Sequence, residues 1–267
     1  MLLIKFIKVT FIAFFKIPNQ AKNYQGTYSI NFIKLIIDQI IRTIGSLGHF
    51  FLKNRKYDDR LESIGNYRLL SEDISSNSII YSCGIAKNIK FDKKISEKFN
   101  CDVYMFDPTK ESYEFMNVNN NPKLKFYNIG VWTEDGDIKF YHPDDKYNNS
   151  EYGNLSATNF FKSGTYIKLP CKSIPSIMKE HKHLKIDVLK MDIEGAAFVI
   201  LNHLLSNNVY PKQIIVELER PFFIYNASLT DFLDYFIKRR KIRKKLKQTG
   251  YDLIELKANE LLAVKLY

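Results

Sequence analysis

The chain has 267 residues, 45% of them hydrophobic and 26% charged, so it can bury a full core and is neither a disordered chain nor a small disulfide-stapled module. Its three cysteines, Cys83, Cys101 and Cys171, are an odd number in no metal-ligand spacing, which indicates neither a disulfide framework nor a zinc site and favours a reducing compartment. The formal net charge of +11 is mostly a local feature, because eight basic residues fall within residues 238–247.

Residues 1–17 form an apolar segment that lysines interrupt. Lys5 and Lys8 break the run and Lys16 closes it, so the uncharged stretch is far shorter than the about 20 residues of a spanning helix. At 100° per residue the three lysines share one narrow stripe, which predicts a helix lying in a membrane surface. A weak signal anchor and a helix packed on the protein's own core are the alternatives.

A second amphipathic helix is predicted over residues 28–53. Its polar face is mixed in sign, so we expect it to dock on the following domain rather than on lipid. A short polar linker follows at residues 54–59. The sequence therefore divides into an N-terminal helical extension, residues 1–58, and a catalytic-type domain, residues 59–267.

From residue 78 the pattern alternates between strands and helices. Strands are predicted at 78–83, 102–106, 124–132, 165–171, 186–191 and 213–219. Helices are predicted at 91–99, 111–118, 174–180, 198–206 and from 229 onward. Residues 137–141 read as a strand that returns as a hairpin on 124–132, and a last hairpin joins 251–256 to 261–266. The pattern predicts an α/β fold with a Rossmann-like, doubly wound parallel sheet.

Residues 142–164 are polar and rich in Asn, Ser and Tyr, without any period. A loop of this length on a rigid scaffold is typical of a lid or a binding loop. His142, at its mouth, is a competing candidate for a catalytic base.

The rest of the chain is organised around residues 186–196, IDVLKMDIEGA. A buried strand ends there at Asp192, Glu194 and Gly195. Ligands of open α/β sheets bind outside the carboxyl ends of parallel strands, which favours a polar site at this point. The alternative is structural, with Asp192 capping the next helix and Gly195 in the turn.

A doubly wound sheet that closes with a hairpin resembles the layout of class I S-adenosylmethionine (SAM) methyltransferases. Asp107 ends the second strand, where a carboxylate can accept both hydroxyls of a ribose. Gly84 follows the first strand and lets the backbone come close to a ligand. A turn or cap role for Asp107 is the alternative.

Five ordered blocks carry a more specific resemblance: YSCGIAKNIKFDKK, CDVYMFDPT, NIGVWTEDGD, IDVLKMDIEGA and IIVELE. From near Ser75 to the C-terminus they resemble the FkbM-type methyltransferase family, in particular its branch with YSFGI and FDPT signatures. The resemblance implies a SAM-dependent O-methyltransferase on a Rossmann-like fold. We expect a small-molecule or glycan-like acceptor, and no metal site is indicated by the spacing of the cysteines and histidines.

The same resemblance implies roles for individual residues. It assigns the methionine end of the cofactor to Tyr81, Ser82, Gly84 and Ile85, the ribose to Asp107, the adenine to Gly130 and Val131, and the acceptor to Asp192 and Glu194. For a hydroxyl acceptor, one of the last two carboxylates would be the base or the positioning group.

The chain departs from the family pattern at three places. Ala197 stands where a second Glu is usual, residues 173–175 read Ser-Ile-Pro in place of Thr-Leu-Asp, and Ala86 replaces a glycine. These departures motivate an alternative function, a catalytically silent SAM-fold module that acts as a membrane-associated adaptor. Nucleic-acid methylation rests only on positive charge, and no Asn/Asp-Pro-Pro-aromatic motif of base N-methyltransferases occurs.

The basic run at residues 238–247 ends the helix that follows the fifth strand. We expect it to project into solvent away from the catalytic edge of the sheet, where it would meet an anionic membrane surface together with residues 1–17. The sequence thus predicts a membrane-associated or cytoplasmic protein, with an N-terminal signal anchor as an alternative.

Overall fold

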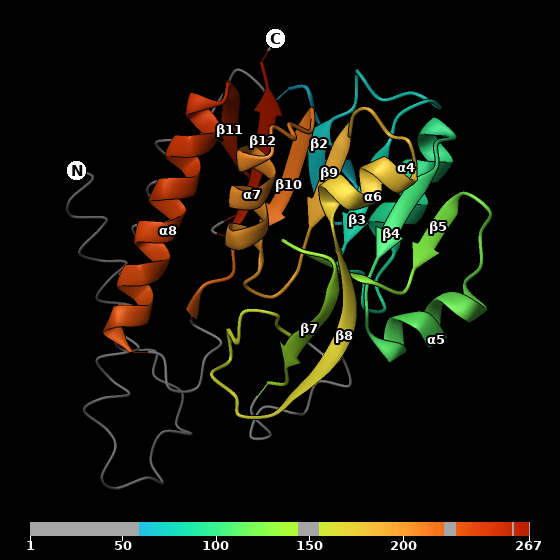
Figure 1. Cartoon of the computed structure of the whole chain (residues 1–267). Coiled ribbons are helices and arrows are strands. Elements are labelled where there is room, and N and C mark those ends of the chain that lie inside the picture. The colour runs from blue at the N-terminus through green and yellow to red at the C-terminus, as the bar shows by residue number, and fades with distance from the viewer. Residues whose placement is uncertain (1–58, 144–154, 222–227, 258, 267) are drawn as a thin grey trace, which may run out of the picture. The chain divides into compact units, whose positions relative to one another are not determined.

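The computed structural model describes residues 59–143, 155–221, 228–257 and 259–266. Its centre is a seven-stranded sheet in the order β11-β12-β10-β9-β3-β4-β5 (Figure 1). Five neighbouring strands run parallel: β3 (Ile80–Cys83), β4 (Val103–Phe106), β5 (Leu124–Tyr127), β9 (Val188–Met191) and β10 (Gln213–Glu217). Two antiparallel strands close one edge: β11 (Tyr251–Glu255) and β12 (Glu260–Lys265). The α/β fold and the closing hairpin are as predicted.

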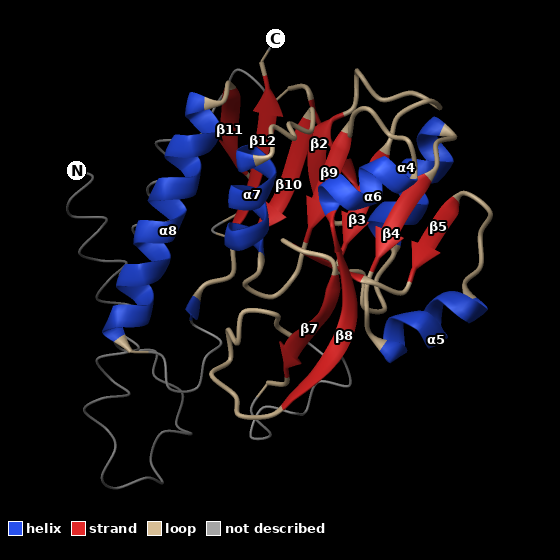
Figure 2. Ribbon diagram, viewed as in Figure 1, coloured by secondary structure: helices blue, strands red, loops and turns tan. Residues whose placement is uncertain are grey.

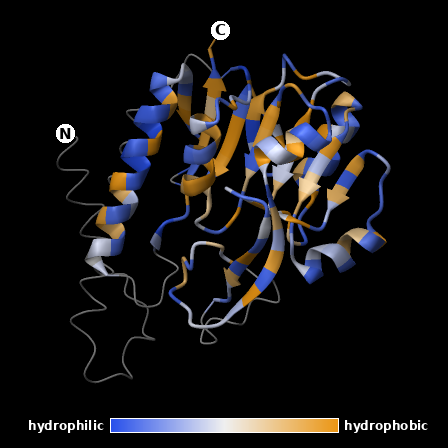
Figure 3. Ribbon diagram, viewed as in Figure 1, coloured by the Kyte–Doolittle hydropathy of each residue, from blue (hydrophilic) through white to orange (hydrophobic). Residues whose placement is uncertain are grey.

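Helices cover both faces of this sheet, as Figure 2 shows. They are α4 (Lys90–Phe99), α5 (Lys110–Val118), α6 (Ile174–Glu180), α7 (Ala197–Ser206) and α8 (Leu229–Gln248). Helices α6, α7 and α8 share one core cluster with alternate strand residues such as Leu189 and Val216. Helix α4 shares the other with Val188 and Ile215. Because both faces are covered, the central strands are mostly apolar (Figure 3), with the buried Lys190 of β9 and Ser82 of β3 as exceptions.

A short hairpin that the sequence pattern did not predict packs on the α4 face. It consists of β1 (Leu61–Ile64) and β2 (Tyr67–Leu70) and turns at Gly65. The side-chain amide of Gln213 ties it to the main sheet, because its oxygen accepts from the Leu70 amide at 2.9 Å and its nitrogen donates to the Leu70 carbonyl at 2.6 Å. This anchor fixes Tyr67 at the carboxyl edge of the sheet.

The predicted hairpin between residues 124–132 and 137–141 is wrong, because both segments pair with a later strand and not with each other. The chain bends after β5, where the Asn128 side chain donates to the carbonyls of Asp107 and Thr109. The remainder forms a three-stranded sheet of β6 (Gly130–Trp132), β7 (Gly136–Tyr141) and β8 (Tyr166–Ser173), with β8 in the middle. The strand predicted at 165–171 therefore belongs to this second sheet, which lies beneath the carboxyl ends of the parallel strands in Figure 1.

Several predictions fall outside the described residues. The N-terminal extension, its boundary at residue 58 and the centre of the predicted loop belong to the residues that the structure does not describe. Within the described ranges, no helix is long and apolar enough to cross a membrane.

Candidate active site

A cavity opens where the carboxyl ends of β3, β4 and β9 meet. It brings together seven of the nine predicted site residues: Gly84, Ile85, Asp107, Gly130, Val131, Asp192 and Glu194. They come from three strand ends and from β6, so residues more than 100 positions apart line one space. This is the edge at which ligands of parallel sheets bind.

Tyr81 and Ser82 are not among the residues that line the cavity, and their contact with the cofactor stays a prediction. Both side chains lie inside strand β3 and are fully buried. The Tyr81 hydroxyl hydrogen-bonds to Nδ1 of His183 at 2.9 Å, within an aromatic cluster that includes Tyr104 and Phe106. Of strand β3 itself, only the last residue, Cys83, lines the cavity.

The loop after β3 depends on two residues with positive φ. Gly84 has φ +74°, and a Cβ there would lie 1.8 Å from the carbonyl oxygen of Asp192, so only glycine fits. Ala86 has φ +44°, a conformation that costs an L-residue roughly 1–2 kcal/mol. Two hydrogen bonds hold it: its amide donates to Asp107 Oδ2 at 3.0 Å, and the Ser112 hydroxyl donates to its carbonyl at 3.2 Å.

Asp107 shapes this loop with both carboxylate oxygens. Oδ2 also accepts from the Ile85 amide at 3.0 Å. Oδ1 accepts from the amide and the hydroxyl of Thr109, at 3.0 and 2.6 Å. A carboxylate offers about four acceptor positions, so a ribose hydroxyl would have to share an oxygen that the chain already uses. The ribose contact stays a prediction, and the loop-forming role is what the geometry adds to it.

A second strained turn, residues 192–195, follows β9 and is called the DIEG turn below. Glu194 and Gly195 have φ +43° and +83°. The Tyr67 hydroxyl donates to Asp192 Oδ2 at 3.0 Å. The buried Ser156 hydroxyl donates to the Glu194 carbonyl at 2.6 Å and accepts from the Phe160 amide at 3.2 Å. Ser156 thereby fastens the described end of the predicted binding loop to this turn.

The carboxyl groups of this edge hold their protons unusually well. Burial, together with the nearby charges of Asp192 and Glu217, raises the pKa of Glu194 to about 7. Burial likewise raises the pKa of Glu217 to about 7, with Asp192 and Glu260 adding to the shift. An acid with a pKa near neutrality is suited to proton transfer. Like-charge repulsion among these groups also marks the edge as favourable for a cation.

Sequence reasoning missed Lys190, Tyr67 and Glu217. Lys190 is the one cation among the described residues that line the cavity, and its ammonium group donates to the Gly84 carbonyl at 2.5 Å. A lysine inside a predicted buried strand was the available signal, because a buried ammonium group needs a partner. No cluster of metal-ligating side chains occurs among the described residues.

The residues present fit SAM, whose sulfonium and ammonium groups are cationic and whose adenosine is largely apolar. The cavity offers the required chemistry: the negative charge of Asp192 at the DIEG turn, and apolar surface from Val131, Phe140 and Ile193. Gly84 lets the backbone turn sharply beside that surface.

The strand order, the antiparallel edge and a cavity at the carboxyl ends of the central strands define a class I SAM-dependent methyltransferase. The family model described as "Methyltransferase FkbM domain" matches residues 85–253, and the chain belongs to this family. Its enzyme activity is SAM-dependent methyl transfer, as predicted.

Two archaeal solved structures are similar at a distance. A fibrillarin pre-rRNA processing protein of Methanococcus jannaschii shares 11% identity, over 78% of this chain and 70% of that chain, with a TM-score of 0.38. Aeropyrum pernix fibrillarin with natively bound S-adenosyl-L-methionine shares 9% identity, over 72% and 67%, with a TM-score of 0.35. Such distant likenesses carry no argument about function. No curated protein matches the chain.

Proposed function

We propose that this protein O-methylates a small-molecule or glycan-like acceptor and that Glu194 is the base that takes the hydroxyl proton. The observation that carries the proposal is a half-buried carboxyl group with a pKa of about 7 on the wall of the cofactor cavity. SAM supplies an electrophilic methyl group when it is bound. The task left to the chain is to orient the acceptor and to hold its proton.

The proposed cofactor contacts come from the loops that follow β3, β4 and β5. Gly84 and Ile85 would lie along the methionine end, Asp107 near the ribose, and Gly130 with Val131 beside the adenine. Asp192 would position the acceptor or the cofactor, since the Tyr67 hydroxyl already fixes one of its oxygens.

The departures from the family pattern favour this enzyme over a silent adaptor. Ala197 is fully buried in the core at the start of α7 and does not line the cavity. Pro175, which stands in place of the Asp, lies in the first turn of α6 and does not line the cavity either. Neither position therefore withdraws a carboxyl group from the residues that surround the cavity.

Calorimetry with SAM, followed by an acceptor screen with labelled methyl groups, tests the proposal. We expect SAM to bind wild type and Glu194→Gln alike, and only wild type to turn over. Absence of SAM binding would refute the enzyme, and binding without turnover on any acceptor would favour the adaptor.

We also propose that the enzyme works at an anionic membrane surface, through one face of α8. Leu233, Phe236 and Ile237 are exposed and share a helical stripe with the exposed Arg240 and Lys244. Apolar groups beside basic ones suit the interface between lipid headgroups and acyl chains. This stripe is the support for membrane association among the described residues.

The basic run itself differs from the prediction. Helix α8 does not project into solvent, since Ile242 and Leu246 are buried. Arg239 and Arg243 pair with Glu255, and the Lys245 ammonium group donates to Ser206 of α7 at 3.0 Å. The run does end at the edge of the sheet opposite the cavity, as expected (Figure 1).

A further inference from the structure

A second cavity lies directly across the DIEG turn from the first. Glu194 lines the first cavity and its neighbour Gly195 lines the second; Ala157 and Thr158 divide in the same way. The two spaces therefore share a wall made of two peptide segments. The Phe160 ring rests on this wall, because a Cβ on Gly195 would lie 2.9 Å from it.

Two polar groups buried at this second cavity have no hydrogen-bond partner among the described residues. Glu219 is 6% exposed, and neither of its carboxyl oxygens makes a hydrogen bond. Tyr235 is 4% exposed, and its hydroxyl is also unpartnered. Both residues line the cavity. Leaving such groups unsatisfied costs about 1–3 kcal/mol each, so a polar ligand that bonds to them is favoured.

The remaining lining is largely aromatic and apolar. It includes Phe160, Phe198 and Val199, and the rings of Phe198 and Tyr235 meet edge to face with centroids 6.0 Å apart. A ligand that fits this lining needs an apolar face as well as hydrogen-bonding groups.

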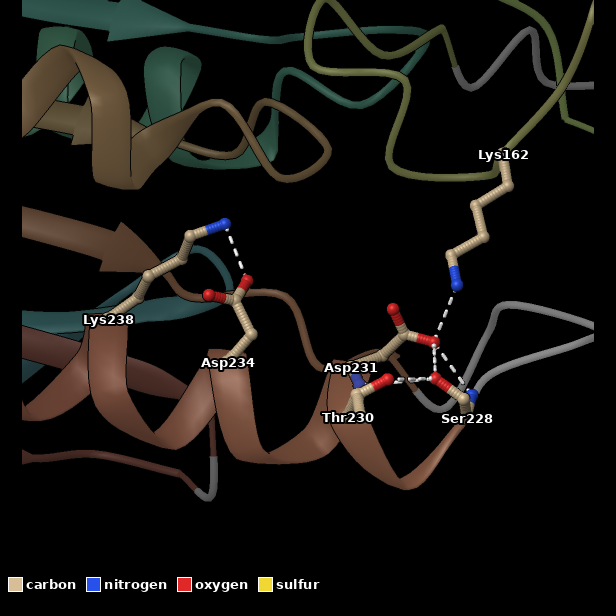
Figure 4. Close-up of polar contacts among 6 residues, drawn as sticks. All are labelled: Lys162, Ser228, Thr230, Asp231, Asp234 and Lys238. Atoms are coloured by element: carbon tan, nitrogen blue, oxygen red, sulfur yellow. Dashed lines mark hydrogen bonds and ion pairs between the residues drawn. The ribbon is translucent and has the colours of Figure 1, made fainter.

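Ion pairs at the rim leave the cavity without net charge. Figure 4 shows Lys162 reaching from the 155–165 segment to Asp231 in the first turn of α8, at 2.6 Å. Lys238 pairs with Asp234 one turn further along the helix, also at 2.6 Å. Burial, and then the charge of Glu194, raise the pKa of Glu219 well above its ordinary value, which favours its neutral form. A neutral carboxylic acid both donates and accepts.

From these contacts we infer that the second cavity binds an uncharged saccharide ring as part of the methyl acceptor. Glu219 and Tyr235 hydrogen-bond to its hydroxyls, and the aromatic side chains pack on its C–H face. The inference rests on the proposed function, because the hydroxyl to be methylated on the same acceptor must reach Glu194 in the first cavity. It names a substrate class and two recognition residues at a site separate from the cofactor cavity.

Saturation-transfer NMR with a panel of monosaccharides and their methyl glycosides tests this assignment. At roughly 10 mM ligand, a complex held by only about 3 kcal/mol still registers. Tyr235→Phe and Glu219→Leu remove the two unpartnered groups, and Tyr113→Phe is the matched control, because Tyr113 is exposed on α5 away from both cavities. SAM affinity is measured on every variant by calorimetry.

We expect at least one saccharide to bind wild type and the control, and to bind both cavity variants about tenfold more weakly. SAM affinity and melting temperature should not fall in Tyr235→Phe, since it loses only an unpartnered hydroxyl. The inference would be overturned if no saccharide gave a saturation-transfer signal, if the signal were equal in all four proteins, or if choline bound in preference to saccharides. In each of these cases wild type would still bind SAM. Loss of SAM binding in wild type would instead overturn the proposed function.

Discussion

Replacing Glu194 with Gln should stabilise the cofactor-free protein at pH 8 while abolishing methyl transfer. The unfolded chain ionises this residue near its ordinary pKa of 4.5, whereas the folded chain holds the proton up to about pH 7. Between these values the folded state binds more protons, so its stability falls as the pH rises, and the whole loss persists above pH 7.

The magnitude follows from the shift. At 1.36 kcal/mol per pKa unit, a rise of this size corresponds to about 3 kcal/mol. Asp192 and Glu217 also contribute to this shift through like-charge repulsion. Neutralising Glu194 relieves this repulsion, so the change in unfolding free energy is shared among the three groups. We therefore expect Glu194→Gln to gain about 1–3 kcal/mol at pH 8 and almost nothing near pH 4.5.

Urea unfolding at several pH values measures this difference, with the slope checked for constancy between variants. Glu97→Gln is the control, because Glu97 is exposed on α4. A stability gain that does not depend on pH would refute the titration of Glu194 in this range. Turnover should fall by about 10²–10⁴-fold in the same variant, as for the loss of a general base. Full activity would place the base elsewhere.

Three further predictions concern the loops and the surface. Asp107→Ala should weaken SAM binding about ten- to hundredfold in calorimetry, since it removes the charged acceptor that holds the first loop; an unchanged dissociation constant in a folded variant would contradict this. Ser156→Ala should lower turnover and cost about 1–3 kcal/mol in urea unfolding, because it frees the DIEG turn; wild-type values for both would show that its hydrogen bonds do not matter. The triple change of Arg240, Lys244 and Lys247 to Gln should reduce sedimentation with phosphatidylserine vesicles by about 3 kcal/mol in binding free energy, without affecting neutral vesicles; equal binding would exclude the α8 stripe.

The fold could be predicted from the sequence where an apolar run marks a strand and polar residues mark its end. Runs of apolar residues placed the five parallel strands, and the residues just after them were placed at the correct edge. Partners of the second sheet could not be predicted in the same way. The turn signal at residues 134–137 favours a local hairpin, whereas β8 inserts between β6 and β7 from about 30 residues further along.

Two residues that no local pattern signals, Tyr67 and Glu219, reach their cavities through tertiary contacts. Tyr67 arrives on a hairpin that the distant Gln213 side chain anchors, and nothing near Tyr67 in sequence signals this. Glu219 looked like the last residue of a strand, but β10 ends at Glu217 and leaves it beside a cavity that α8 completes. A pattern with a period of two cannot distinguish these outcomes.

Strain at the two strand ends explains why the site depends on residues that do not touch the reaction. Ala86 and Glu194 both have positive φ without being glycine, one in each loop that lines the cofactor cavity. Each is held from outside its own loop, Ala86 by Asp107 and Glu194 by Ser156. Strained residues persist only where their surroundings over-determine them, so these two hydrogen-bonded supports fix where the carboxyl group of Glu194 and the amides of the first loop point. Asp107 and Ser112 hold Ala86 in its positive-φ conformation, so the loop keeps this geometry although alanine stands where a glycine is typical.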